Sequence, residues 1–198
     1  MTKIRNSVLV LLPAALATLA FSSGHAIADE PPDIEIVSAD IGGSGCPVGT
    51  AQAVLSADKR TLSIIFDQYF GEDSEYVSCN VAVSLSVPDG VTIVLVDIDY
   101  RGYASIPDLP GRKAKFRSEY FFAGDMGPVK VTNFGRGYDH SFMILHDIVG
   151  KVRAPCGAEV IARANTSVRT WGEGSFLAID TADVTTNGIN FHLDWEEC

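Results

Sequence analysis

The residues best suited to chemistry lie at the end of an apolar run in the middle of the chain. Asp97, Asp99, Arg101 and Tyr103 are spaced two residues apart, so on a β-strand all four would project from one face. Carboxyl groups two residues apart on a strand lie about 6 to 7 Å from each other. Acid and base pairs of glycoside hydrolases work in this range, and burial with mutual repulsion would raise one pKa. Asp97 and Asp99, with Tyr103 beside them, are the candidate catalytic residues.

A structural role for the same carboxylates is the alternative, and we favour it. Lys115 and Arg117 belong to an alternating segment that follows a turn rich in proline and glycine, which predicts an antiparallel return strand. That hairpin would place Asp99 opposite one of the two cations and keep the carboxylates ionised. A glycosidase also needs a groove lined with aromatic side chains, and the chain has two tryptophans. We therefore expect no enzymatic activity and no cofactor.

The histidines of the mature chain do not indicate a catalytic triad. No G-x-S-x-G or comparable nucleophile context occurs. His146 shares an apolar face with Phe142 and Ile144, which is typical of a packed, hydrogen-bonded side chain.

Aromatic residues beside glycines are better candidates for recognition. Tyr138 and Trp171 lie in the segments 135–140 and 171–174, and such rings stack on sugar faces or fill pockets of a partner. The loops of β-sandwiches gather at the ends of the fold. Tyr138, Trp171 and Arg101 are the candidate binding residues, although both rings could equally cap the core.

An acidic segment around Gly71 could bind calcium through carboxylate oxygens. Its members are Asp67, Glu72, Asp73 and Glu75. The D-x-D-x-D-G spacing of a calcium loop is absent, so we expect a solvated loop and no metal.

The N-terminus has the pattern of a secretory signal peptide. Lys3 and Arg5 precede an apolar run from Val8 to Phe21, and Ala26-Ile27-Ala28 fits a cleavage site. The run is shorter than the roughly 20 residues that a membrane-spanning helix needs. We expect residues 1–28 to be removed and residues 29–198 to form one secreted, extracellular domain without a transmembrane segment, with the periplasm as the alternative location.

Charge narrows the range of partners. The formal net charge is −10, and the predicted signal peptide holds two of the 15 Lys and Arg and none of the 25 Asp and Glu, so the mature charge is −12. An acidic surface repels phosphate backbones. We therefore expect no nucleic acid partner, and an extracellular polysaccharide, a cell envelope or a secreted protein instead.

Four cysteines, Cys46, Cys79, Cys156 and Cys198, lie in the mature region. An even number in an oxidising compartment predicts two disulfides, and the absence of a C-x-x-C pair argues against zinc. Three pairings are open. If the strands that hold Cys79 and Cys198 are antiparallel neighbours, Cys79 pairs with Cys198 and Cys46 with Cys156.

Alternating apolar residues predict an all-β fold. About ten short strands separated by turns, with no helical periodicity, are typical of a two-layer antiparallel β-sandwich of jelly-roll or Greek-key type. A closed barrel is the alternative. In the long central strand we expect Val94, Val96, Ile98 and Tyr100 to face the core.

Several sequence blocks also resemble a known family. They are G-S-G-C-P at 43–47, V-D-I-D-Y-R-G-Y at 96–103, S-E-Y-F-F-A-G at 118–124, A-P-C-G at 154–157 and W-E-E-C at 195–198. Together they resemble a family of small secreted microbial proteins classed as a domain of unknown function. The resemblance implies secretion, a single domain and disulfides, and it supplies no catalytic residues.

The sequence therefore predicts a secreted, disulfide-linked, non-catalytic β-sandwich that acts as an extracellular binding or surface-associated module for carbohydrate or the cell envelope. Two alternatives remain: a secreted hydrolase using Asp97 and Asp99, and a secreted inhibitor or effector of another protein.

Overall fold

The computed structural model describes residues 30–179 and 188–198. Within this range, Pro31–Cys198 forms one compact unit, and its regular structure is all β. The predicted signal peptide lies outside the described residues. The part of the chain that the structure describes contains no helix with the length and apolar character to cross a membrane.

The residues that the structure describes form thirteen strands. In chain order they are β1 Glu35–Gly42, β2 Ala51–Leu55, β3 Thr61–Phe66, β4 Phe70–Glu72, β5 Tyr76–Ser86, β6 Val91–Ser105, β7 Lys113–Phe122, β8 Asp125–Met126, β9 Lys130–Phe134, β10 Asp139–Arg153, β11 Val160–Trp171, β12 Phe176–Ala178 and β13 Ile189–Glu197.

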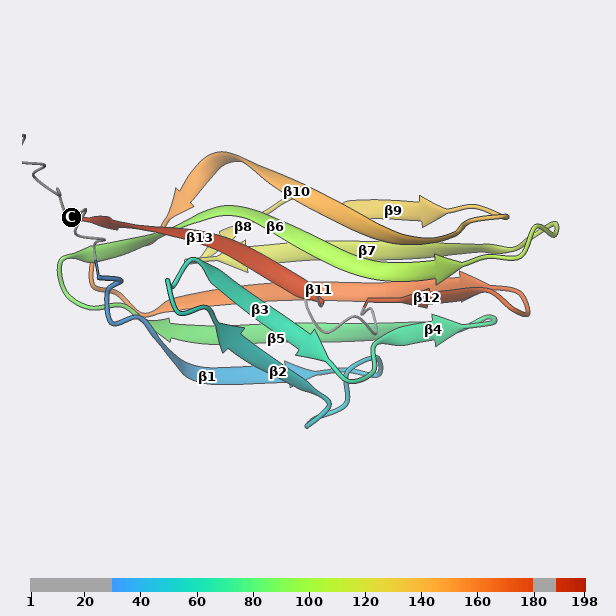
Figure 1. The fold of residues 1–198 in the computed structure, drawn as a ribbon, viewed down its shortest axis with the longest axis horizontal. Coiled ribbons are helices and arrows are strands. Elements are labelled where there is room, and N and C mark those ends of the chain that lie inside the picture. Colours follow the sequence, from blue (N-terminus) through green and yellow to red (C-terminus); the bar gives the residue numbers. More distant parts are fainter. Residues whose placement is uncertain (1–29, 180–187) are drawn as a thin grey trace, which may run out of the picture. The chain divides into compact units, whose positions relative to one another are not determined.

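The strands form two antiparallel sheets packed face to face, which confirms the predicted sandwich (Figure 1). The six-stranded sheet has the order β1-β5-β11-β7-β8, with β9 also paired to β7. The seven-stranded sheet has the order β2-β3-β13-β6-β12-β4, with β10 also paired to β6. Strands that are consecutive in sequence often lie in different sheets, so sheet neighbours come from distant parts of the chain.

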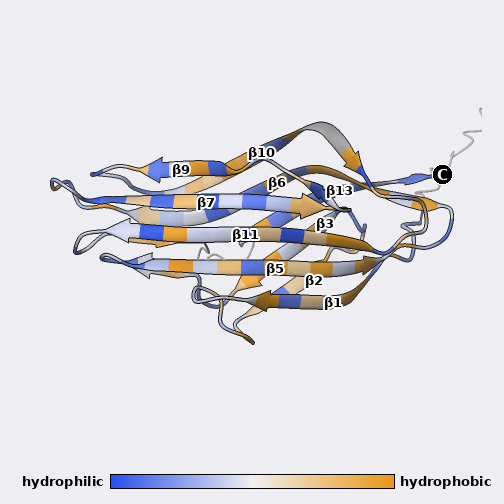
Figure 2. Ribbon diagram, turned by 180° about the vertical axis from the view of Figure 1, so that it is seen from behind, coloured by the Kyte–Doolittle hydropathy of each residue, from blue (hydrophilic) through white to orange (hydrophobic). Residues whose placement is uncertain are grey.

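The core lies between the two sheets. In β7 and β11 every second residue is buried, from Ala114 to Phe122 and from Val160 to Thr170, while the residues between them face outward. This alternation follows from the two-residue period of a strand. Both strands lie inside the six-stranded sheet, and their outward residues form the middle of its outer face (Figure 2).

The predicted core face of β6 is wrong at Val94 and Val96, and Val94 is buried outside the core cluster. Val96 is 36% exposed, whereas Ile93, Leu95, Ile98 and Tyr100 are buried in the core cluster. The register between β13 and β6 shifts between His192 and Leu193, so β6 holds one extra residue at Val96 and the alternation changes phase there.

The weakly favoured disulfide pairing is also wrong. The bonds are Cys46–Cys79 and Cys156–Cys198. Cys79 lies on β5 of the six-stranded sheet and Cys198 follows β13 of the seven-stranded sheet, so the two strands are not neighbours. The loop after β1 instead folds onto β5, where the Gly45 amide donates to the Ser78 carbonyl at 2.9 Å.

The predicted hairpin between Val91–Ser105 and the segment around Lys115 does not form. Strand β6 belongs to the seven-stranded sheet and β7 to the six-stranded sheet, because the segment that contains Pro107 and Pro110 crosses between the layers. Asp99 therefore does not face Lys115 or Arg117. Those cations face β11 and β9 instead.

Candidate functional site

The predicted carboxylate cluster lies on the outer face of the seven-stranded sheet. Asp99 is almost fully buried and accepts hydrogen bonds from Arg101 Nε at 2.8 Å, Asn190 Nδ2 at 3.0 Å and His192 Nε2 at 2.7 Å. Burial alone would raise the pKa of Asp99, but the bonds from Arg101, His192 and Asn190 outweigh it and hold the pKa below its usual value. Both carboxylate oxygens are occupied, so Asp99 organises its neighbours.

Asp97 has the opposite environment. Its Oδ1 is buried without a hydrogen-bond partner among the described residues, and His192 Nε2 lies 3.7 Å away. Desolvation raises the pKa of Asp97, opposed by His192 and reinforced by Asp99 and Asp147. Asp147 faces it directly across the pairing of β10 with β6. A carboxyl with a raised pKa beside one with a lowered pKa is a pattern found in acid–base pairs.

Tyr103 is not drawn into this pair. Its hydroxyl donates to Asp139 on β10, and its backbone pairs with Ala178 of β12. The candidate catalytic set is therefore divided between an enclosed carboxylate, a partly buried carboxylate and a phenol that has its own partner.

A second cluster lies on the outer face of the six-stranded sheet. Trp171 is the last residue of β11, and three cations surround its ring: Lys113 Nζ at 4.7 Å, Lys115 Nζ at 5.8 Å and Arg169 Cζ at 5.5 Å from the centroid. Lys113 and Lys115 come from β7, directly opposite Trp171 and Arg169. Arg169 also lies 5.9 Å from the ring of Tyr76, a 55% exposed residue of β5. We call Trp171, Lys113, Lys115, Arg169 and Tyr76 the aromatic–cationic platform.

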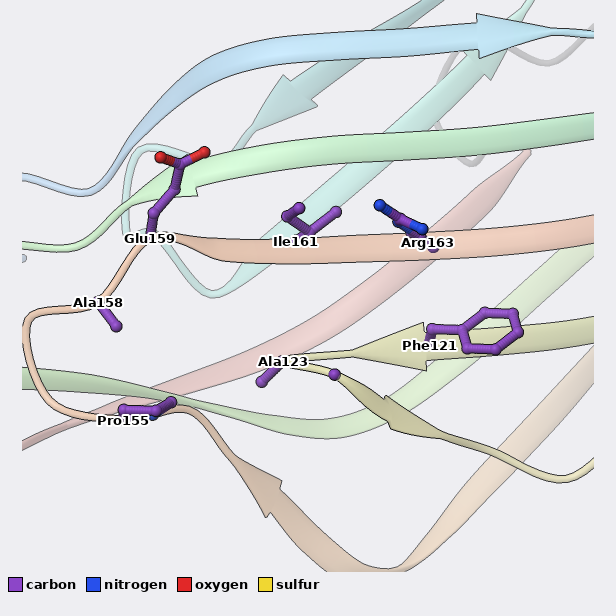
Figure 3. Close-up of a pocket in the computed structure, with 8 residues that line it drawn as sticks. Phe121, Ala123, Pro155, Ala158, Glu159, Ile161 and Arg163 are labelled. Carbon is purple, nitrogen blue, oxygen red and sulfur yellow. The ribbon is translucent and has the colours of Figure 1, made fainter.

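The same face contains a hollow at the other end of β7 and β11. Its volume is about 410 Å³, and its lining includes Phe121, Ile161, Arg163, Glu159 and Pro155. Arg163 and Ile161 project from β11 and Phe121 from β7, directly across from Arg163 (Figure 3). Aromatic and cationic side chains therefore occur at both ends of the outer face of this sheet.

The other predicted site residues are dispersed. Tyr138 packs edge-on against Phe134 with centroids 5.1 Å apart and joins the rim of the core. Arg101 belongs to the Asp99 cluster.

The acidic residues considered for calcium bind the protein's own backbone. Asp73 Oδ1 accepts a hydrogen bond from the Gly174 amide at 2.8 Å, and Glu75 Oε2 accepts one from the Glu72 amide at 3.3 Å, within the turn after β4. Across residues 30–179 and 188–198, no three His, Cys, Asp or Glu residues are grouped as metal ligands would be.

Sequence reasoning missed the cations of the platform as a site. Lys113, Lys115 and Arg117 occupy every second position of their segment. This pattern predicted a cation that would lie opposite Asp99 and neutralise it. Arg169 and Trp171 share a face at a spacing of two residues, which is the signal that could have joined them to Lys115 once the neighbour of β11 was known.

Comparisons with known proteins agree with the sequence resemblance. A family model described as "Domain of unknown function (DUF4360)" matches residues 32–198. An "Uncharacterized secreted protein" of Arthroderma benhamiae is 30% identical over 196 residues, covering 92% of this chain and 79% of the relative.

Two solved structures are similar to this chain at a low level. One is TmCBM61 in complex with β-1,4-galactotriose, at 10% identity and a TM-score of 0.34, covering 83% of this chain and 91% of that one. The other is the mannan-recognising module TmCBM27, at 10% identity and a TM-score of 0.32, covering 83% and 99%.

Proposed function

Because the chain belongs to the DUF4360 family, a domain of unknown function, we propose its function from the geometry of its surfaces. The protein is secreted and acts without catalysis as an extracellular module that binds polysaccharide of a cell wall or envelope. The ligand contacts the outer face of the six-stranded sheet. The proposed secretion is supported by the predicted signal peptide, the two disulfides and the secreted relative.

One observation carries the proposal: the Trp171 ring lies on an open sheet face among Lys113, Lys115 and Arg169. An indole offers a flat apolar surface for the face of a sugar ring, and nearby cations donate hydrogen bonds to sugar oxygens. The ring is held on a strand inside the sheet, so little conformational entropy is lost when a ligand binds.

The enclosed Asp99 argues against catalysis. A nucleophile or general base must reach the substrate within hydrogen-bond distance, but Asp99 has a 3% exposed side chain and is covered by its three donors.

Depletion from solution tests the proposal. The oxidised mature chain would be mixed with a panel of insoluble polysaccharides and cell-wall fractions, and soluble protein and soluble reducing ends would be followed in the same tubes. We expect depletion by at least one polymer without new reducing ends. Depletion by none would contradict the proposal and favour a protein target, as for an inhibitor or effector.

A matched pair of variants locates the site. Trp171→Ala should abolish depletion, because it removes the ring at the centre of the platform. Phe70→Ala is the control, since Phe70 is 39% exposed and lies on the seven-stranded sheet. Equal loss in both variants would place binding elsewhere.

A hydrolase remains the second candidate, favoured by one observation: the pKa values of Asp97 and Asp99 are shifted in opposite directions. In this case Asp97 would be the acid. New reducing ends that disappear in Asp97→Asn, with the fold intact, would establish hydrolysis and overturn the proposal of a non-catalytic module.

A further inference from the structure

Charge is divided between two pairs of neighbouring strands, one pair in each sheet. The paired strands β7 and β11 of the six-stranded sheet carry five cations, Lys113, Lys115, Arg117, Arg163 and Arg169, against one carboxylate, Glu119. The paired strands β6 and β13 of the seven-stranded sheet carry five carboxylates, Asp97, Asp99, Asp194, Glu196 and Glu197, against one cation, Arg101. A chain of net charge −10 therefore presents a basic surface over β7 and β11, which we call the basic face.

The protein's own carboxylates leave most of this charge uncompensated. Arg117 pairs with Glu119 at 3.4 Å, and among the described residues no salt bridge reaches the other four cations. Lys115 lies directly opposite Arg169 across the ladder, and like charges at directly opposed positions destabilise a sheet. This repulsive pair of cations lowers the stability of the fold, and a bound anion would relieve the repulsion.

Protection of a sheet edge does not explain the cations. Lysines are common on edge strands, where they block pairing with other chains. Strand β11 lies between β5 and β7, and β7 between β11 and the short strands β8 and β9.

The acidic sheet does not cancel the basic face. Stacked sheets lie about 10 Å apart, and the side chains of the two outer faces point away from each other. A ligand on the basic face therefore contacts the cations of β7 and β11 directly and none of the carboxylates of β6 and β13.

The basic face is also long enough for a polymer. Arg163 and Arg169 are six residues apart on β11, or about 20 Å at the rise of a strand. Asn165 projects from the same face between them, and Ser167 beside it is buried. Trp171 marks one end and Phe121, beside the hollow, marks the other.

A peptide fits this surface less well than a saccharide. Extended peptides gain most of their affinity from backbone hydrogen bonds at a free sheet edge, and β11 is paired on both sides. Flat aromatic rings and forked cationic donors suit the faces and carboxylates of sugar rings.

Resting on the proposed function, we infer that the ligand is a carboxylated polysaccharide, a polyuronate, lying along β11. Its carboxylates contact Lys113, Lys115 and Arg169 at one end and Arg163 at the other. Trp171 stacks on a sugar ring at the end where Lys113, Lys115 and Arg169 lie.

The test compares three soluble probes for binding to the oxidised mature chain by titration calorimetry: polygalacturonate, its fully methyl-esterified form and poly-glutamate. We expect polygalacturonate to bind best. Its affinity should fall steeply from about 0.01 M to about 1 M salt, as the Debye length shrinks from about 30 to 3 Å. The methyl ester keeps the sugar backbone and removes the charge, so it should bind at least about tenfold more weakly.

Two charge-reversing variants test whether the cations of the basic face bind the ligand. Lys115→Glu should weaken polygalacturonate binding by about tenfold. It should leave the melting temperature equal or higher, because it replaces a repulsive cross-strand pair with an attractive one. Arg136→Glu is the control: it changes the net charge equally at an exposed residue outside this face. Equal losses in the two variants would overturn the assignment of the site.

The remaining outcomes separate this inference from the proposed function. Equal binding of the methyl ester would leave a saccharide module but overturn the selection for carboxylates. Equal or tighter binding of poly-glutamate would make an acidic peptide the occupant and overturn the inference. Binding of none of the probes, together with depletion by a neutral insoluble polymer, would overturn the inference alone. Absence of depletion as well would overturn both.

Discussion

At the scale of single residues, the neighbouring aspartates of β6 differ in their partners. Asn190 and His192, about ninety residues later in the chain, donate hydrogen bonds to Asp99. Asp97 Oδ1 has no hydrogen-bond partner among the described residues. The partners of Asp99 depend on the pairing of β13 with β6, which no local pattern specifies.

The contrast between the aspartates predicts opposite effects on stability. Asp99→Ala should lower the free energy of unfolding by about 2 kcal/mol, because it leaves the buried amide of Asn190 and the partly exposed donors of Arg101 and His192 without their acceptor. Asp97→Asn should raise stability at neutral pH. The raised pKa of Asp97 means that its ionised form is less stable in the folded than in the unfolded chain. Urea unfolding at pH 7 measures both changes, and a destabilised Asp97→Asn would contradict the account given for Asp97.

His146 makes a pH-dependent contribution that can be measured separately. Its side chain is buried, its Nε2 lies 3.1 Å from Ser118 Oγ, and its ring is 4.8 Å from that of Tyr100. Desolvation, with a smaller effect from Lys130, lowers the pKa of His146 to about 4. An unfolded histidine has a pKa of about 6.5, so between pH 6.5 and 4 the unfolded chain binds a proton that the folded chain does not. The free energy of unfolding is therefore unaffected by His146 above pH 6.5 and falls by about 3 kcal/mol as the pH decreases towards 4.

Replacing this histidine should flatten that part of the pH profile. In His146→Phe the loss of stability between about pH 6.5 and 4 should disappear, leaving the loss at lower pH that follows from the lowered pKa of Asp99. Chemical unfolding at a series of pH values is the measurement. An unchanged slope would show that His146 takes up its proton without a penalty in the folded state.

At the scale of strands, alternation and turn residues predicted most elements, and pairing was where prediction failed. Strands β2 and β3, joined by a short turn, pair as a hairpin within one sheet. The connection from β6 to β7 has equally good turn residues but crosses between the sheets. The extra residue at Val96 could not be predicted either. In a continuous apolar run, no polar residue marks the position where the alternation between the two faces of the strand changes.

The two disulfides should differ in their resistance to reduction. Cys46 and Cys79 are both fully buried, whereas Cys156 and Cys198 are exposed. An attacking thiolate must reach a sulfur atom, so a mild reductant under native conditions should open Cys156–Cys198 first. Alkylation of the freed thiols followed by peptide mass spectrometry would identify the order. Earlier labelling of Cys46 and Cys79 would contradict the burial of that bond.

At the scale of the whole molecule, total charge and charge distribution lead to different expectations. The composition gives a sequence pI of about 4.7, and from it the sequence predicted repulsion of anionic partners. The fold places β7 and β11 side by side in one sheet and β6 and β13 side by side in the other. Composition gives only the net charge of the chain. The order of the strands in the two sheets shows that the cations lie together on one face.

This division of charge predicts retention of the protein on both kinds of ion-exchange resin. At pH 7 and low salt the mature chain should bind an anion exchanger through the face around Glu196 and Asp194, and also bind a cation exchanger through Lys115 and Arg169, although its net charge is negative. Salt should release it from the cation exchanger at moderate concentration, because exposed charges are screened within about 10 Å at 0.1 M. Lys115→Glu combined with Arg169→Glu should abolish cation-exchange retention and strengthen anion-exchange retention. Passage of the wild-type chain through the cation exchanger at the lowest salt would show that the acidic sheet dominates the field around both faces. Any affinity for polysaccharide would then have to come from the aromatic rings alone.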